Sequence, residues 1–253
     1  MDRPHLRFLG TGTAFHADGR GSQCFLVEAG SPAPSFMIDL GPTAMAAVMR
    51  MGVQLERLDR LFITHLHGDH VAGWPFLLLH LNFVDRRSRP LDVHGPEGVR
   101  GCLEGLMQLC YRDIIDGTKL GFEIRYHELP VTERSGLDGG GLAFDVLPMD
   151  HHPSSIGYRF DLSGKTLGVT GDTRWCANLE ALARRSEVFL LECTSVRKGG
   201  QAHVSLQEIR ERVDSLGDCR VVLVHLPDEV AAELAADPIP RVIASHDGMI
   251  FPL

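Results

Sequence analysis

Three histidines and one aspartate lie within six positions of each other, in the segment His65-x-His67-x-Asp69-His70. An apolar run precedes the segment and another follows it, so it occupies the turn between a predicted strand and a predicted helix. In extended chain His65 and His67 share a face, and Asp69 and His70 can face a second position. Buried polar side chains need partners, and imidazole with carboxylate suits Zn, Fe or Mn. We therefore predict a metal site here.

One short segment cannot complete two metal sites, so further ligands must come from elsewhere. His151, Asp172 and His225 each follow a predicted strand. The carboxyl ends of strands are where open α/β sheets keep their sites. A single histidine or aspartate in such a place is as often structural as functional. Their occurrence together, in a chain that also holds the histidine-rich segment, favours metal ligation.

Strand-like and helix-like runs occur in both halves of the chain. We predict strands at 6–9, 24–28, 36–39, 60–64, 142–147, 156–160, 166–170, 188–191 and 220–224, and helices at 43–51, 70–83, 96–109, 176–184 and 205–216. The glycine-rich stretch 134–141 predicts a hairpin or a mobile loop. This mixture indicates an α/β protein whose helices cover the faces of its sheets.

Composition limits the class of protein. The 253 residues, 44% hydrophobic and 23% charged, are ordinary for a globular chain of one large domain or two small ones. Because the net charge is −8, we do not expect the surface as a whole to attract nucleic acid. We expect no membrane partner, because no apolar stretch is long enough to span a bilayer. Six cysteines without a CxxC pair, and a polar start, favour the cytoplasm.

The ligand order HxHxDH, His, Gly-Asp-Thr, His resembles that of the metallo-β-lactamase superfamily. Within it, the chain is most similar to the ribonuclease Z-like branch of phosphodiesterases. Segments that carry the resemblance are 8–13, 37–41, 94–96, 151–159, 170–173, 191–194, 203–205 and 247–249. The resemblance extends from residue 6 to residue 253 and implies a single domain over 1–253. The implied fold is an αββα sandwich of two mixed β-sheets flanked by helices.

The resemblance also implies a dinuclear site with two divalent ions, most simply Zn²⁺, although Mn²⁺ or Fe²⁺ would accept the same ligands. The family pattern assigns His65, His67 and His151 to the first metal, Asp69, His70 and His225 to the second, and Asp172 to the bridge between them. Asp39 would orient one ligand from behind. His152 would be a neighbour of the site and not a ligand.

A mechanism follows from these charges. Two divalent cations lower the pKa of a shared water, so that hydroxide is available near neutral pH. They also offset the negative charge that builds in the transition state. Asp69 can take a proton from that water. His203, which lies 31 residues past Asp172 (203 − 172), is the candidate general acid, and Glu192 would orient it.

The substrate is expected to be a small phosphodiester, such as a cyclic nucleotide, a cyclic phosphate or a short oligonucleotide. The tRNA 3′-processing enzymes of this branch carry a long basic arm between the third histidine ligand and the bridging aspartate. Here the interval from His151 to Asp172 is only 21 residues (172 − 151). Nucleic acid, and with it a tRNA 3′-processing endoribonuclease, is therefore less favoured.

Two other functions stay open. The same metal-activated water could attack a carboxylic ester, lactone or thioester. The fold also carries non-hydrolytic cofactor-biosynthesis and binding proteins, but these often lose ligands, and every ligand position is filled here.

The run 74–83 is apolar around most of a predicted helix, which is more than one buried face requires. That run predicts a homodimer, or else a fully buried helix.

Overall fold

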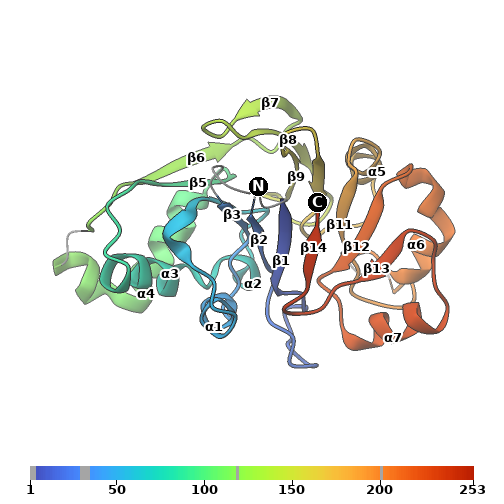
Figure 1. Ribbon diagram of the computed structural model, residues 1–253, viewed down its shortest axis with the longest axis horizontal. Coiled ribbons are helices and arrows are strands. Elements are labelled where there is room, and N and C mark those ends of the chain that lie inside the picture. The colour runs from blue at the N-terminus through green and yellow to red at the C-terminus, as the bar shows by residue number, and fades with distance from the viewer. Residues whose placement is uncertain (1–3, 29–34, 118–119, 200–201) are drawn as a thin grey trace. The chain divides into compact units, whose positions relative to one another are not determined.

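The computed structural model describes residues 4–28, 35–117, 120–199 and 202–253. The chain divides into two compact units. Unit 1 comprises residues 1–10, 21–130 and 247–252, and unit 2 comprises residues 11–20, 131–246 and 253. Each unit contains one seven-stranded sheet (Figure 1). Among the described residues, no helix has both the length and the apolar character that crossing a membrane requires.

The sheet of unit 1 has the order β14-β1-β2-β3-β4-β5-β6. Its strands are β1 (His5–Gly10), β2 (Cys24–Glu28), β3 (Ser35–Ile38), β4 (Leu58–Phe62), β5 (Leu91–Pro96), β6 (Ile124–Leu129) and β14 (Ile250–Pro252). The pairings from β14 to β3 are antiparallel and those from β3 to β6 are parallel. The sheet is therefore mixed, as predicted.

The helices of unit 1 pack on its sheet through one apolar cluster. They are α1 (Ala44–Arg50), η1 (Leu55–Arg57), α2 (Gly68–Val71), α3 (Trp74–Leu79), the π-helix η2 (His80–Val84) and α4 (Val99–Gly117). Ala47, Leu77 and Leu103 come from three helices and share this cluster with Leu61 and Val93 of the strands. Such burial of a helix stripe on a sheet face is the main source of stability in this layer.

Two predicted helices of unit 1 were wrong in extent. The predicted helix 70–83 is divided into α2, α3 and η2, with the break at Gly73. The backbone there packs so closely that an added Cβ would lie 2.4 Å from the Gly41 carbonyl oxygen. The predicted helix 96–109 begins only at Val99, because Pro96 is the last residue of β5. The strands β5 and β6 were not predicted.

The sheet of unit 2 has the order β13-β12-β11-β10-β9-β8-β7. Its strands are β7 (Arg134–Asp138), β8 (Ala143–Pro148), β9 (Ile156–Asp161), β10 (Thr166–Val169), β11 (Val188–Glu192), β12 (Arg220–Val224) and β13 (Val242–Ala244). Pairing is antiparallel from β7 to β10 and parallel from β10 to β13. The glycine-rich stretch 134–141 is part of the β7–β8 hairpin.

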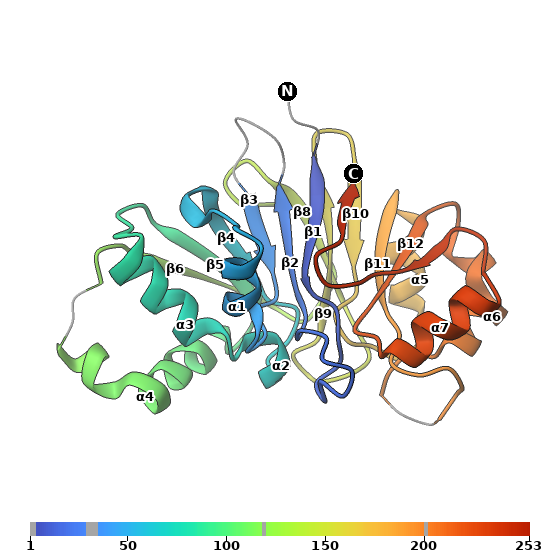
Figure 2. The same ribbon diagram turned by 60° about the horizontal axis from the view of Figure 1, so that its bottom comes forward.

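The helices of unit 2 are α5 (Ala177–Arg184), α6 (Leu206–Arg212), the short η3 (Val213–Leu216) and α7 (Asp228–Ala236). Helix α5 packs on β8, β9 and β10, and α7 packs beside β13; α5, α6 and α7 share one apolar cluster with the strands (Figure 2). Helix α6 starts with a capping box, in which the Ser205 hydroxyl accepts from the Glu208 backbone and the Glu208 carboxylate accepts from the Ser205 backbone. Ser205 was the first residue of the predicted helix 205–216, whereas α7, β13 and β14 were not predicted.

Candidate metal centre

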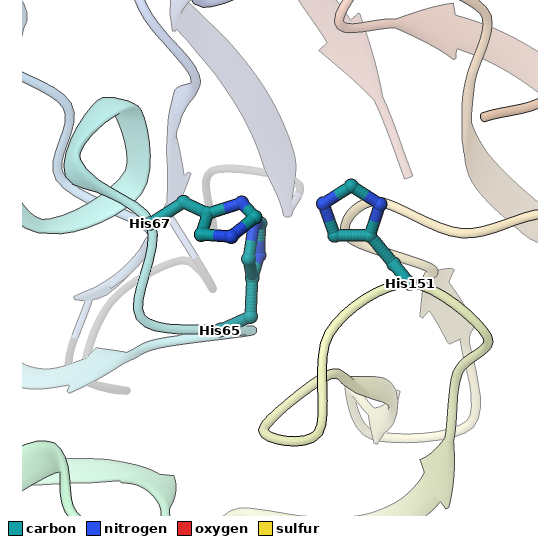
Figure 3. A group of neighbouring side chains, drawn as sticks. All are labelled: His65, His67 and His151. Atoms are coloured by element: carbon teal, nitrogen blue, oxygen red, sulfur yellow. The ribbon is translucent and has the colours of Figure 1, made fainter. Parts of the chain in front are cut away.

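The loop between β4 and α2, together with the first turn of α2, gathers four of the predicted ligands in unit 1. The ring centroids of His65 and His67 lie 4.7 Å apart, and those of His65 and His70 lie 4.0 Å apart. His70 Nε2 is 3.4 Å from Asp69 Oδ2. Figure 3 shows His65 and His67 extending from the same turn, with their rings adjacent. A strand end followed at once by a short helix thus clusters three imidazoles and one carboxylate.

Asp39 holds this cluster in place through hydrogen bonds. Its side chain is 0% exposed, and its backbone is left-handed with φ 56°, a conformation that aspartate tolerates better than most residues. Oδ1 accepts from the Thr64 backbone N–H at 2.8 Å, and Oδ2 accepts from Gln23 Nε2 at 2.8 Å. His70 Nδ1 donates to Oδ2 at 2.8 Å. Because Nδ1 holds the proton, His70 presents Nε2 as its ligand atom.

Unit 2 gathers a second cluster around Asp172, just beyond β10. Asp172 Oδ2 is 3.5 Å from His225 Nε2, 3.9 Å from His151 Nε2 and 3.9 Å from His203 Nδ1. His225 follows β12 with φ 50°, and His151 lies in the loop after β8. Strands β8, β10 and β12 run in the same direction, because β8 and β10 are each antiparallel to β9 and β10 to β12 are parallel. Their carboxyl ends therefore bring His151, Asp172 and His225 to one place, as their positions after strands predicted.

The spacing around Asp172 fits a cation better than direct hydrogen bonds. Distances of 3.5–3.9 Å between imidazole nitrogen and carboxylate oxygen exceed those of hydrogen bonds. A divalent metal takes nitrogen and oxygen ligands at about 2.0–2.2 Å, so two ligands of one ion stand farther apart than a hydrogen-bonded pair. His151 and His225 each present Nε2 to Asp172 Oδ2 at such distances. Their two imidazoles and the carboxylate thus suit a divalent metal.

Behind His203 lies a fully buried carboxylate, Glu192. His203 Nδ1 donates to Glu192 Oε1 at 2.8 Å, and the Thr173 backbone N–H donates to the same oxygen at 2.7 Å. Burial, and then the negative charge of Asp172, raises the pKa of Glu192 well above its ordinary value. The hydrogen bond fixes the ring of His203 and leaves Nε2 as the atom that can meet a substrate.

His151 is held by a backbone group. Its Nδ1 donates to the Ala202 carbonyl oxygen at 2.9 Å, which leaves Nε2 as the ligand atom. The neighbouring His152 bonds instead to the Ser154 hydroxyl through Nδ1, at 2.7 Å. Ala202 immediately precedes His203, so the loop that carries the candidate acid also orients a candidate ligand.

Within each unit the structure brings the predicted residues together. His65, His67, Asp69, His70 and Asp39 form the cluster of unit 1, and His151, Asp172, Glu192, His203 and His225 form the cluster of unit 2. Sequence reasoning missed the residues that hold these side chains, chiefly Gln23 and Thr64. Neither residue type stands out in a sequence, and the backbone donors and acceptors carry no sequence signal at all.

The sequence family described as "Anti-Pycsar protein Apyc1" matches residues 4–246. The chain belongs to this family. The Apyc1-family chain is also 30% identical to a protein named Ribonuclease Z from Mycobacterium sp. (strain KMS), over 92% of this chain and 87% of that relative. The predicted ribonuclease Z-like resemblance is therefore confirmed.

Solved structures confirm the fold. The human short-form tRNase Z superposes with a TM-score of 0.78 at 22% identity, covering 98% of this chain and 100% of that one. A diphosphatase of the PhnP family gives a TM-score of 0.74 at 19% identity, covering 99% and 98%. The Apyc1-family chain thus has the predicted α/β metallo-β-lactamase fold, with two mixed sheets flanked by helices. Its 30% identity to a protein named Ribonuclease Z supports a metal-dependent phosphoric diester hydrolase.

Proposed function

We propose that this protein hydrolyses a small phosphodiester at a dinuclear metal site. The observation that carries the proposal is His203, held by buried Glu192 within 3.9 Å of Asp172. Hydrolysis of a phosphodiester expels an alkoxide, which benefits from a dedicated proton donor. A positioned histidine beside metal-type ligands supplies that donor. An activated carboxylic ester has less need of one.

The metal assignment remains that of the family pattern. His65, His67 and His151, drawn in Figure 3, would hold the first ion, Asp69, His70 and His225 the second, and Asp172 would bridge them. Two divalent ions, when bound, make water acidic enough to attack near neutral pH and offset charge on the phosphate. Zn²⁺ is our proposal for both, since imidazole and carboxylate nitrogen and oxygen donors suit it. His70 and His151 have the Nδ1 hydrogen bonds that such ligands require.

The protein's own groups then move the protons. Asp69 accepts the proton of the attacking water. His203 releases its Nε2 proton to the leaving oxygen, because its Nδ1 is already committed to Glu192. Glu192 acts as a positioning residue that keeps the ring in this orientation. The backbone N–H of Thr173 ties the same carboxylate to the turn that carries Asp172.

The length of one interval supports a small substrate. Between His151 and Asp172, a stretch that is described in full, the chain forms only β9, a turn and β10. The long basic arm of tRNA-processing enzymes has no counterpart in this interval. With a net charge of −8, the protein is poorly equipped for the many phosphate contacts of tRNA. Cyclic nucleotides, cyclic phosphates and short oligonucleotides fit this description better.

Three other functions make different predictions. The similarity to proteins named Ribonuclease Z favours tRNA 3′-end processing. An ester, lactone or thioester hydrolase would share the metals but not depend on His203. A non-hydrolytic binding or cofactor-biosynthesis protein would show no turnover, yet the complete ligand set argues against that function.

A substrate panel separates these functions. Metal-free protein is reconstituted with Zn²⁺, Mn²⁺ or Fe²⁺ and assayed on cyclic nucleotides, bis-p-nitrophenyl phosphate, p-nitrophenyl acetate, a lactone and a precursor tRNA. We expect turnover of the phosphodiesters that depends on added metal. Turnover restricted to the acetate and lactone, or to precursor tRNA, would replace this proposal with the corresponding function.

We also propose that the protein is a homodimer. The helical stretch from α3 to η2 buries Trp74 and Leu77 but leaves Phe76 46%, Phe83 50% and Val84 66% exposed. The predicted fully buried helix is therefore wrong, and the apolar character continues onto the surface. Light scattering across micromolar concentrations should give twice the mass of the chain. A monomer at every concentration would contradict the dimer without touching the catalytic proposal.

Two broader expectations accompany this function. We propose that both units act as a single hydrolase domain over 1–253, since the proposed ligands come from each. All six cysteines are free thiols, which supports the cytoplasm as the compartment.

A further inference from the structure

His225 holds its place at the end of β12 in an uncommon backbone conformation. Its φ of 50° is left-handed, which few residues other than glycine adopt. Such a conformation persists where the surrounding structure fixes the chain around the residue. The conformation is what brings His225 Nε2 to 3.5 Å from Asp172 Oδ2. The groups that hold the backbone beside His225 therefore also determine where this candidate ligand lies.

Hydrogen bonds hold the chain on both sides of His225. Before it, the Leu223 carbonyl oxygen accepts from the Ser245 backbone N–H at 3.0 Å and from the Ser245 hydroxyl at 2.6 Å. After it, the Leu226 backbone N–H donates to the Thr11 carbonyl oxygen at 2.9 Å. Ser245 and Thr11 are both buried. The placement of His225 thus depends on where these two residues are held.

Arg20, in the loop between β1 and β2, joins the two anchors. Its Nη1 donates to the Thr11 hydroxyl at 3.0 Å and to the Ser245 carbonyl oxygen at 2.9 Å. Its Nε donates at 2.6 Å to Oδ1 of Asp228, the first residue of α7. The Arg20 side chain is only 14% exposed, so water competes little for these bonds. One rigid guanidinium fork therefore ties together the segments that flank His225.

We propose that Arg20 is a positioning residue for His225 and thereby sets the affinity of the metal ion that His225 binds. The inference rests on the proposed function, which assigns His225 to the second ion. Arg20 touches neither metal nor substrate in this role, because it acts through Thr11 and Ser245 on the backbone. Removing a group that orients a metal ligand commonly lowers metal affinity about 10-fold to 100-fold.

The test measures the affinity of the metal-free, full-length protein for Zn²⁺ by competition with a chromophoric chelator. Arg20→Ala should weaken the binding of one ion about 10-fold to 100-fold and leave the other ion unaffected. Arg20→Lys should lie between Arg20→Ala and the wild type, since it keeps the charge but not the planar fork. The visible spectrum of the Co²⁺-loaded protein should also change in Arg20→Ala, because it reports the geometry of the ligands. Wild-type affinities for both ions in Arg20→Ala would overturn the inference.

The matched control is Arg159→Ala, in β9 of the same unit. Arg159 is 22% exposed, and its Nε donates to the Arg185 carbonyl oxygen at 2.6 Å and its Nη1 to Asp145 Oδ2 at 3.3 Å. It resembles Arg20 in burial and in the kind of bonds it makes, but neither partner adjoins a candidate ligand. Arg159→Ala should lower the melting temperature and leave both Zn²⁺ affinities unchanged. Equal losses of affinity in Arg159→Ala and Arg20→Ala would overturn the inference by indicating general destabilisation.

Excess Zn²⁺ separates a positioning role from general damage to the site. Arg20→Ala retains every candidate ligand, so saturating Zn²⁺ should restore most of its kcat. A loss of activity that excess Zn²⁺ does not restore would overturn the inference. If Arg20→Ala does not fold, Asp228→Ala removes one bond of the same guanidinium at a side chain that is 64% exposed. It should weaken one ion to a smaller degree, and unchanged affinities in Asp228→Ala would then count against the role of Arg20.

The affinity measurement keeps this inference separate from the proposed function. If the wild type binds two ions but hydrolyses no phosphodiester, the proposed function fails alone, and weaker binding of one ion by Arg20→Ala still supports the positioning role. If the wild type hydrolyses phosphodiesters and Arg20→Ala binds both ions as tightly as the wild type does, the inference fails alone.

Discussion

His203 shows how a single hydrogen bond can define a role. Its Nδ1 is bound to Glu192, so a proton can be exchanged only at Nε2. If His203 is the general acid, His203→Ala should lower kcat about 10²-fold to 10⁴-fold on substrates with alkoxide leaving groups. It should have far less effect on p-nitrophenyl phosphodiesters, because p-nitrophenolate leaves unaided. Steady-state kinetics on both substrate types measures the difference.

The matched variant for this prediction is Glu192→Gln. It keeps a hydrogen-bond acceptor for the ring but removes the charge, so it should show a smaller loss with the same dependence on leaving group. Metal content should stay unchanged in His203→Ala. Equal losses on good and poor leaving groups would indicate substrate positioning instead. Loss of metal would make His203 a ligand.

His94 makes a separate prediction about pH. Its ring is 4% exposed and is stacked between Phe62 and His127, with centroid distances of 4.6 Å and 4.4 Å. Burial, and then the positive charge of His127, lowers the pKa of His94 to about 4 from 6.5. As the pH falls from 6.5 to about 4, His94 therefore binds a proton in the unfolded chain but stays neutral in the folded chain. The free energy of unfolding decreases across this window by roughly 3 kcal/mol.

Urea unfolding of the metal-free protein at several pH values between 7 and 4 measures this loss. His94→Phe keeps a ring in the stack but cannot take up a proton. The free energy of unfolding of this variant should therefore fall less with decreasing pH than that of the wild type. Parallel curves for the two proteins would show that His94 does not titrate in this way.

At the scale of elements, close backbone packing positions the histidine-rich loop. A Cβ on Gly41 would lie 2.2 Å from Ser22 Cβ and 2.3 Å from the Asp69 carbonyl oxygen. Gly41→Ala should therefore displace the loop, lower stability by about 1–3 kcal/mol and reduce metal retention. Gly68 lies one residue before Asp69 but has no atom within 4 Å of an added Cβ. Gly68→Ala should be nearly neutral in melting temperature and metal content, and equal effects of the two variants would contradict this account.

Elements with strong local patterns could be predicted from the sequence. The strands β2 and β12 were predicted with their observed limits, because apolar β-branched and aromatic residues fill them between clear turns. β6 was missed because none of its side chains is fully buried and Arg125, His127 and Glu128 are exposed, so its apolar pattern is weak. β13 and β14 have three residues each, too few for any periodicity. The break at Gly73 depends on its close packing against Gly41, a residue that is distant in the sequence.

The candidate ligands were predictable for a different reason. Histidine and aspartate at strand ends are conspicuous by residue type, and their order matched a known family. The supporting groups were not. Gln23 and Thr64 act through hydrogen bonds to Asp39, and the carbonyl of Ala202 orients His151. Such partners depend on the three-dimensional arrangement of the chain, because any residue has a backbone carbonyl and many exposed positions carry glutamine or threonine.

For the whole molecule, the proposed assignment draws each metal's ligands from both units. Metal binding would then add to the folding free energy of the entire chain. Removal of metal by a chelator should lower the melting temperature, and re-addition of Zn²⁺ should restore it. Calorimetry checks this expectation. Identical melting temperatures with and without metal would mean that the ions contribute nothing to stability.

The most direct test of the dinuclear site is the number of metal ions per chain. Elemental analysis is applied to protein that has been reconstituted with Zn²⁺, freed of unbound metal and assayed for phosphodiester hydrolysis. We predict two ions per chain in the active wild type, and both activity and at least one ion lost in Asp172→Ala. One ion or fewer at full activity, or two ions retained by Asp172→Ala, would contradict the bridged dinuclear site.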